Sequence, residues 1–227
     1  MTMETLLQFP LFQGMSNDDL MEVVGQTRFE FMKCGAGKVI VKSGEHCNEL
    51  LFIAEGHFHT ETFSDNRSYV LTEYMHAPFV IEPERLFGYS QRYTSTFTAD
   101  DRCLFFSISK SDISKIIGSQ FVFRLNVMNI LSTEVQRQKD VLWRHSSGEL
   151  SQCIVGFIRR RCRYPAGKKE IRITMKQLAT ELHAKRVNIS QALNAMQSDG
   201  LLTLSRGKIT IPVFEMLIQS EKIAKKQ

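Results

Sequence analysis

The 227-residue chain has little of what marks disordered, fibrous, secreted or membrane proteins. Its 5 prolines and 13 glycines are too few for a disordered or fibrous chain, and no apolar run approaches the ~18 residues of a membrane span. The five cysteines are an odd number without a C-x-x-C pair, which is atypical of a disulfide framework. Residues 1–13 lack the basic start and apolar stretch of a signal peptide. We therefore expect a cytoplasmic protein without a membrane partner.

The spaced motifs of the common enzyme classes are also missing. The sequence has no Ser–His–Asp or Cys–His arrangement at a recognisable turn, no glycine loop that would cradle a phosphate, and no zinc-type ligand spacing. The paired carboxylates Asp18–Asp19 and Asp100–Asp101 are more simply a helix start and a turn. We therefore expect that the protein is not an enzyme.

Positive charge is concentrated in the last third of the chain. Residues 1–143 hold 13 Lys and Arg against 18 Asp and Glu, a net charge of −5, whereas residues 144–227 hold 16 against 6, a net charge of +10. This asymmetry is typical of a protein in which only one domain binds a polyanion. The alternative is a merely solvated basic surface, as residues 222–227 can be.

Residues 31–108 have the pattern of short strands. Six β-like segments are separated by glycines and by the cluster Ser64–Asp65–Asn66, which predicts a small antiparallel barrel or sandwich. Ahead of it, Ser16 precedes an amphipathic stretch with Asp18 and Asp19 in its first turn, which indicates a short helix.

From Ser111 to about His145 the apolar residues change to helical spacing. Ser132 and Lys139 interrupt an otherwise apolar heptad track, which favours a short coiled coil between two copies of the chain. The alternative is that the stripe packs on its own β domain. The predicted dimer seam consists of Phe121, Leu125, Met128, Val135 and Leu142.

The segment after Ser146–Ser147–Gly148, a predicted hinge, has the order of a winged helix-turn-helix. A helix ends in the basic run Arg159–Arg161, and a short strand (170–173) and two helices follow. Two further short strands, 201–204 and 208–211, then bracket a tight turn at 205–207.

The second of the two helices, residues 185–197, has one apolar and one polar face. At ~100° per residue, Ile189, Leu193 and Met196 share the apolar face. A helix fits the major groove, where Arg, Asn and Gln bind purine edges and an apolar side chain contacts the thymine methyl. The predicted base-reading residues are Arg186, Val187, Ser190, Gln191 and Asn194. Taken alone, Val187 can equally be a surface valine. The predicted phosphate contacts are Lys176, Lys185, Arg206 and Lys208.

Over nearly its whole length the chain resembles the Crp/Fnr family of bacterial transcription regulators. Residues 11–16, LFQGMS, resemble the family's opening LFxGLS, and residues 51–56, LFIAEG, resemble LYFIxxG. Gly37 to Gly44–Glu45 resembles the G-x-x-I…G-E hairpin, and residues 186–193, RVNISQAL, resemble RETVSRxL.

The resemblance implies an α+β fold with three parts. These are a cyclic-nucleotide-binding-like β-roll (a double-stranded β-helix) at residues 1–117, a dimerisation helix and hinge at 118–147, and a winged helix-turn-helix at 148–227. It further implies a homodimer on a pseudo-palindromic operator in double-stranded DNA, an unknown small-molecule effector, and RNA polymerase as a partner.

The DNA-reading motif departs from the family pattern. Val187 takes the place of the family's glutamate and Gln191 that of its final arginine, so only Arg186 is retained of three charged base readers. We therefore expect a half-site different from the family's common TGTGA.

The effector region departs further. The family holds the cyclic-nucleotide ribose and phosphate with an F-G-E glutamate and an R-S/T arginine. Counting forward from Glu82 puts Arg92 at the arginine's position, whereas counting back from Ala99 puts Tyr93 there and Pro83 at the glutamate's position. Neither register supplies both, and proline removes an amide that a phosphate needs, so we do not expect cyclic AMP to bind. The candidate pocket residues are Glu82, Glu84, Arg92, Tyr93 and Thr94.

Two alternatives for the function remain open. His57 and His59 project from one face of a predicted strand and are weak haem candidates, although exposed polar alternation on a strand is the better explanation. Cys34, Cys47 and Cys103 are too dispersed in sequence for an iron–sulfur cluster. The alternatives to the predicted DNA-binding regulator are therefore a haem- or redox-responsive sensor of the same family, and a signal-binding module whose winged helix binds another protein.

Overall fold

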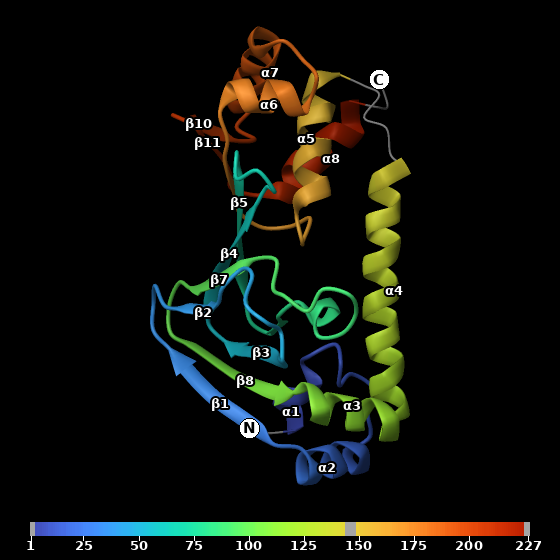
Figure 1. Cartoon of the computed structure of the whole chain (residues 1–227). Coiled ribbons are helices and arrows are strands. Elements are labelled where there is room, and N and C mark those ends of the chain that lie inside the picture. Colours follow the sequence, from blue (N-terminus) through green and yellow to red (C-terminus); the bar gives the residue numbers. More distant parts are fainter. Residues whose placement is uncertain (1–2, 144–148, 225–227) are drawn as a thin grey trace. The chain divides into compact units, whose positions relative to one another are not determined.

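The computed structural model describes residues 3–143 and 149–224, which form two compact units (Figure 1). Unit 1 consists of residues 1–58 and 76–142, and unit 2 of residues 59–75 and 143–227. The segment 59–75 therefore packs with the C-terminal part of the chain, although unit 1 surrounds it in sequence. The hinge predicted at Ser146–Ser147–Gly148 lies outside the described residues. The three domains defined from the sequence stay a prediction.

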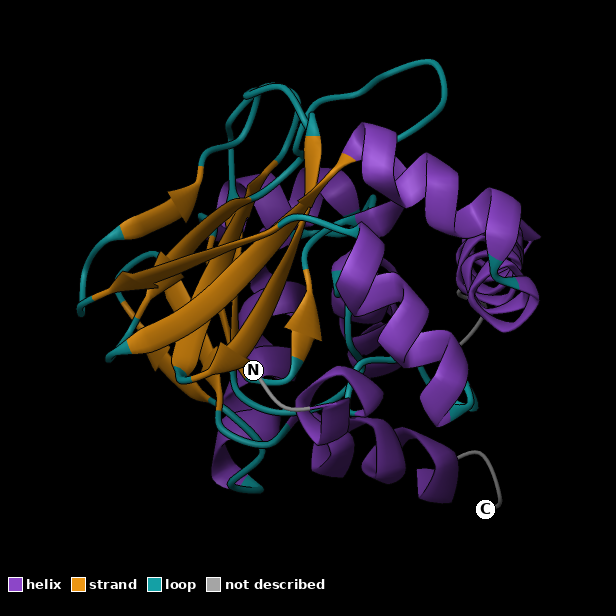
Figure 2. Ribbon diagram, turned by 90° about the horizontal axis from the view of Figure 1, so that it is seen from below, coloured by secondary structure: helices purple, strands orange, loops and turns teal. Residues whose placement is uncertain are grey.

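Unit 1 is a β fold with helices at its two ends, as the sequence predicted. Its strands form an antiparallel sheet in the order β1-β8-β3-β6 and a second antiparallel pair, β2 with β7. Strands, orange in Figure 2, predominate between residues 29 and 109, and helices, purple, follow directly. The elements of unit 1 are α1 (Met3–Leu7), α2 (Asn17–Gln26), β1 (Phe29–Cys34), β2 (Val39–Val41), β3 (Glu49–Glu55), β6 (Phe79–Val80), the 3-10 helix η1 (Pro83–Arg85), β7 (Thr96–Ala99), β8 (Cys103–Ser109), α3 (Lys110–Ser119) and α4 (Phe121–Trp143).

Local sequence sets the start of α2, and aromatic rings fill the core of unit 1. Ser16 accepts a hydrogen bond from the Asp19 amide at 3.1 Å, and the Ser16 amide donates to the Asp19 carboxylate at 3.3 Å, which makes a capping box. Phe52 and Phe106 stack with 4.7 Å between ring centroids, and Phe9 meets both edge-on.

The long helix α4 buries one face and exposes the other. Phe123 is fully buried, and the Asn126 side chain donates hydrogen bonds to the carbonyls of Leu11 and Gln13, which fixes the helix on unit 1. The predicted seam lies on the opposite side. Phe121, Leu125, Met128 and Val135 are all exposed, with 55% of Met128 and 39% of Leu125 accessible. The side chain of Leu142 is not among those described.

Unit 2 is a winged helix-turn-helix extended by a hairpin. Its sheet has the order β10-β11-β9-β5-β4, and residues 70–73 of β5 pair antiparallel with residues 169–172 of β9. The sequence did not predict this pairing, nor the last helix. The elements are β4 (His57–Phe63), β5 (Val70–His76), α5 (Leu150–Arg161), β9 (Lys169–Arg172), α6 (Met175–Glu181), α7 (Arg186–Ser198), β10 (Thr203–Ser205), β11 (Lys208–Ile211) and α8 (Phe214–Ala224).

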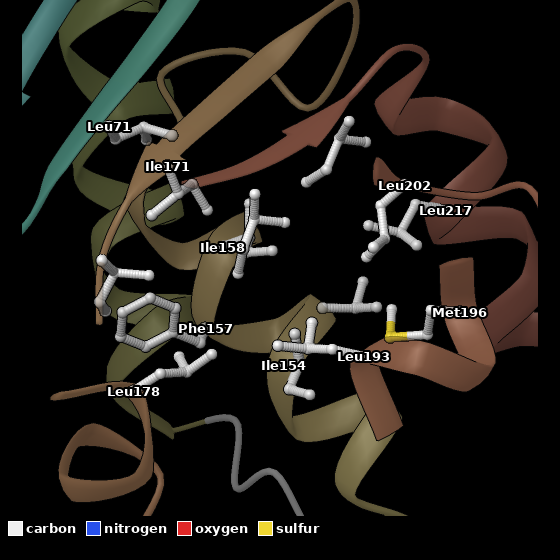
Figure 3. Packing of buried hydrophobic residues seen from close by; sticks show 14 of the residues in the cluster. Leu71, Ile154, Phe157, Ile158, Ile171, Leu178, Leu193, Met196, Leu202 and Leu217 are labelled. Atoms are coloured by element: carbon white, nitrogen blue, oxygen red, sulfur yellow. The ribbon is translucent and has the colours of Figure 1, made fainter. Parts of the chain in front are cut away.

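The core of unit 2 draws apolar side chains from every one of its layers. Figure 3 shows Phe157 and Ile158 of α5 between the strands and the other helices, with Leu71 contributed by β5. Leu193 and Met196 of α7 complete this core, as their helical spacing predicted.

No helix of residues 3–143 and 149–224 is long and apolar enough to cross a membrane.

Candidate nucleic-acid interface and sensor residues

The helix pair α6–α7 presents a polar face on a rigid support. Thr174 caps α6 by accepting a hydrogen bond from the Gln177 amide at 3.1 Å. His183 has a φ of 51° in the turn that follows, and the Ala184 amide returns to the carbonyl of Ala179. These contacts fix where α7 begins. Ile189 is fully buried, so the opposite face of α7 faces outward.

The structure places the five predicted base-reading residues on this outward side. Arg186, Gln191 and Asn194 are exposed and Ser190 is half-buried. Val187 has 65% of its surface accessible.

Basic side chains from three separate elements converge beside the start of α7. A hollow of about 580 Å³ is bounded by the first turn of α6, by α7 and by the β10–β11 turn. Lys176, Arg186, Arg206 and Lys208 line it, although 30 residues separate the first from the third in sequence. Lys185 is exposed directly before α7.

Most of these cations lack a compensating carboxylate. Lys208 is the exception, because its ammonium lies 3.2 Å from Glu170. Burial alone would raise the pKa of Glu170, but hydrogen bonds from Lys168 and Lys208 lower it overall. Lys176, Lys185, Arg186 and Arg206 form no ion pair with any described residue. Four uncompensated positive charges beside a polar helix face suit a polyanion.

The basic run at the end of α5 has a different arrangement. Arg161 donates to the Glu181 carboxylate at 3.0 Å and to the Tyr69 hydroxyl at 2.6 Å, and its guanidinium lies 3.8 Å from the Phe157 ring centroid. Arg161 therefore joins α5 to α6 and to the hairpin. Burial, and then the charges of Arg161 and Arg159, lower the pKa of Arg160.

The predicted effector residues lie in unit 1, and only some of them come together. Glu82 is fully buried, and its carboxylate accepts hydrogen bonds from the Thr94 amide and hydroxyl, both at 2.7 Å, and from the Ser95 amide at 3.1 Å. Arg92 is exposed and donates to the Gly44 carbonyl at 2.7 Å. The Glu82 carboxylate is therefore satisfied by the chain itself.

The two remaining candidates of this region have separate surroundings. Tyr93 is buried, its hydroxyl donates to the Glu49 carbonyl at 3.3 Å, and burial raises its pKa. Glu84 lies in η1 and lines a cavity to which neither Tyr93 nor Thr94 contributes.

The histidine and cysteine candidates form no metal centre among the described residues. Nδ1 of His57 lies 2.7 Å from the Asp101 carboxylate. The hydrogen bond from the His57 amide, and then this side-chain contact, lower the pKa of Asp101. His59 packs near Tyr74. No group of three or more His, Cys, Asp or Glu in the described part of the chain is arranged to hold a metal ion.

Two of the cysteines that are distant in sequence lie opposite one another. Cys34 of β1 pairs with Cys103 of β8 in the strand register, and both are free thiols. Burial raises the pKa of both, that of Cys103 to about 11. The 69-residue separation hides this pair from any sequence motif.

Two family models match the chain, and each coincides with one part of this architecture. A cyclic nucleotide-binding domain matches residues 31–120, and a Crp-like helix-turn-helix domain matches residues 150–220. Together they cover more than two thirds of the chain, in the order that the resemblance implied. The chain belongs to the Crp/Fnr family. Members of this family are transcription regulators and not enzymes, so the chain is a Crp/Fnr-type regulator with a cyclic-nucleotide-binding-like domain and a helix-turn-helix domain.

Two solved structures are similar to the chain at low sequence identity. A putative regulator of the family from Eubacterium rectale is 19% identical, with 93% of this chain and 97% of that chain covered and a TM-score of 0.51. The catabolite activator protein of Thermus thermophilus is 14% identical, with the same coverage and a TM-score of 0.49. No curated protein matches the sequence.

Proposed function

We propose that this Crp/Fnr regulator binds a pseudo-palindromic operator as a homodimer, with α7 in the major groove. The observation that carries the proposal is the position of Arg186 at the junction of the outward face of α7 and the hollow lined by Lys176 and Arg206. One side of that residue adjoins groups suited to base edges and the other adjoins groups suited to phosphates.

The base contacts follow from the exposed side chains. Arg186 binds guanine through two hydrogen bonds, Gln191 and Asn194 bind adenine, and Ser190 accepts or donates at either base. Val187, which is 65% exposed, contacts the thymine methyl. Specificity then depends on a mixed polar and apolar face and not on three charged residues.

The phosphate contacts differ in strength. Lys176, Lys185 and Arg206 have no carboxylate partner among the described residues, so they neutralise phosphates without losing an existing ion pair. Lys208 shares Glu170 with Lys168, which makes its contribution smaller.

Dimerisation proceeds through the exposed side of α4. Phe121, Leu125, Met128 and Val135 recur at coiled-coil spacing on that side, and Leu142 continues the series. Two copies related by a twofold axis then present their α7 helices to successive major-groove turns, ~34 Å apart.

A small-molecule effector in the β domain shifts the population of DNA-binding conformations, and RNA polymerase is the partner at the promoter. Cyclic AMP does not suit the domain. The Glu82 carboxylate is occupied by Thr94 and Ser95, and Arg92 donates to Gly44, so neither group is available for a ribose or a phosphate without rearrangement.

The test is a selection of random duplexes with the purified full chain, followed by anisotropy titrations at several salt concentrations. We expect a pseudo-palindromic site, and we expect Arg206→Ala to weaken binding to all sequences. Because each dimer loses two phosphate contacts, the log–log salt slope should fall by about 2. Arg28→Ala in unit 1 removes the same charge and should leave binding unchanged. Equal affinity for selected and scrambled duplex would contradict the proposal and favour a protein-binding role of the winged helix.

A further inference from the structure

Unit 1 contains a large apolar cavity that DNA binding does not use. It has a volume of about 500 Å³ and lies among η1 with the residues that follow it, α3, and one flank of α4. Leu50, Leu86, Ile117, Ile130 and Leu131 provide apolar walls. Its size is within the range of 300–1,000 Å³ typical of small-molecule sites.

One buried hydrogen-bond donor in this cavity lacks an acceptor. Arg85 lines the cavity, and its Nε is inaccessible to solvent and has no hydrogen-bond partner in the described structure. Its guanidinium pairs with no described carboxylate. Arg85 as a whole is half-buried, and leaving the buried Nε of its charged group unsatisfied is unfavourable. An anionic ligand in this cavity would give that Nε an acceptor.

The nearby acidic groups do not supply that acceptor. Glu134 also lines the cavity, but its carboxylate accepts from the Arg137 guanidinium at 2.8 and 3.1 Å and from Gln138 at 3.0 Å. Glu84 lines the cavity next to Arg85 in sequence and has an interaction of its own. With the Glu134 charge neutralised by Arg137, an anionic group can approach Arg85.

We infer that this cavity binds an amphipathic carboxylate, a small molecule with an apolar body and a single carboxylate group. The carboxylate pairs with the Arg85 guanidinium through charge-assisted hydrogen bonds, and the body fills the space between Leu86 and Ile130. The site shares only Glu84 with the candidate effector residues of the sequence, and it requires neither Glu82 nor Arg92.

The position of the cavity gives its occupant a route to α4. Leu131 and Val135 line it, and Val135 also belongs to the exposed seam. A ligand there contacts the flank of the helix whose outer side is proposed to dimerise, so occupancy and dimer geometry are coupled. Only this regulatory consequence rests on the proposed function; the binding itself does not.

The experiment measures binding of octanoate, octan-1-ol and decanoate to the full chain by isothermal titration calorimetry, without DNA. We expect octanoate to bind at least tenfold more tightly than octan-1-ol, which lacks the charge. We expect decanoate to bind roughly tenfold more tightly than octanoate, because two more methylenes are buried.

Three variants locate the site. Arg85→Met should abolish the preference for octanoate over octan-1-ol, while Arg92→Met, an exposed arginine of the same unit, should leave it unchanged. Leu131→Trp should weaken decanoate binding at least tenfold, with circular dichroism to verify that the variant is folded. The inference is overturned if neither acid binds at millimolar concentration, or if Arg85→Met keeps the preference. Binding of decanoate by a chain that fails to select DNA would overturn the proposed function and leave this inference standing.

Discussion

Glu73 of β5 and Lys169 of β9 form a buried ion pair, with 3.1 Å between Oε1 and Nζ and with 2% and 0% of the two side chains exposed. The two residues lie opposite one another in the strand register. The Glu73 carboxylate also accepts hydrogen bonds from the amides of Arg163 and Tyr164, directly after α5. One carboxylate of the hairpin thus binds a strand and a helix end of the winged domain, which explains why residues 59–75 belong to unit 2.

We predict that Glu73→Gln destabilises the protein by about 3–5 kcal/mol, because the Lys169 ammonium then remains buried without a counter-charge. Urea unfolding followed by circular dichroism measures the change. The double variant with Lys169→Met removes the orphaned charge and should recover much of the loss, whereas Glu30→Gln at the surface should change stability by under about 0.5 kcal/mol. A loss below about 1 kcal/mol for Glu73→Gln would show that the pair does not anchor the hairpin.

These contacts also show where sequence reasoning reaches its limit. The spacing of Ile189, Leu193 and Met196 predicts the buried face of α7 because a helix turns every 3.6 residues, and the structure confirms that face. The β-like segment at residues 68–74 predicts a strand but carries no information about its partner, since the β5–β9 pairing joins segments about 100 residues apart. Strand pairing is a tertiary choice, and local patterns do not encode it.

The sensor region was less predictable for a similar reason. The sequence identifies Glu82 and Thr94 as neighbours of a pocket, but only the folded chain shows that they hydrogen-bond to one another. Arg85 has no signal in the sequence, because its distinguishing property is a buried Nε without a partner. The boundary between α3 and α4 at Gln120 has no proline, and the nearby Gly118 lies inside α3 and not after its end.

Dimerisation through α4 predicts a specific loss. Leu125→Lys combined with Met128→Lys places four like charges across the seam of two copies, so we expect monomers and loss of operator binding. Light scattering coupled to size exclusion gives the mass, and anisotropy gives the DNA affinity. Met21→Lys on α2 places a lysine at another exposed apolar position and should remain dimeric. A dimer that still binds the operator after both substitutions would remove α4 from the interface.

The buried thiol of Cys103 predicts a loss of stability in alkaline solution. Burial is the largest cause that raises its pKa to about 11, against 9.0 for an unperturbed thiol. Between these pH values the unfolded chain ionises first, so the stabilising contribution is complete below about pH 9 and is lost as the pH rises toward 11. The destabilisation caused by Cys103→Ala should therefore be larger at pH 8 than at pH 10.5.

Urea titrations of both proteins at the two pH values test this expectation, with Cys153→Ala as the control for a thiol that is not fully buried. Equal destabilisation by Cys103→Ala at both values would mean that the thiol ionises alike in the folded and unfolded chain. The same burial should protect Cys103 from iodoacetamide at pH 7, because alkylation requires the thiolate.

The outward face of α7 gives the sharpest test of specificity. If Val187 and Gln191 occupy the positions that the resemblance assigns to the family's glutamate and final arginine, then Val187→Glu with Gln191→Arg completes the charged triad beside Arg186. We expect the double variant to gain affinity for TGTGA half-sites and to lose it for the native operator, each by ~10-fold or more, since a well-placed base contact contributes ~1–3 kcal/mol. Parallel selections with both proteins measure the change. The matched variant Ser198→Ala, at the far end of α7, should select the native operator. Retention of the native operator by the double variant would mean that other residues determine the sequence that is bound, because two of the five proposed base contacts would then have changed without effect.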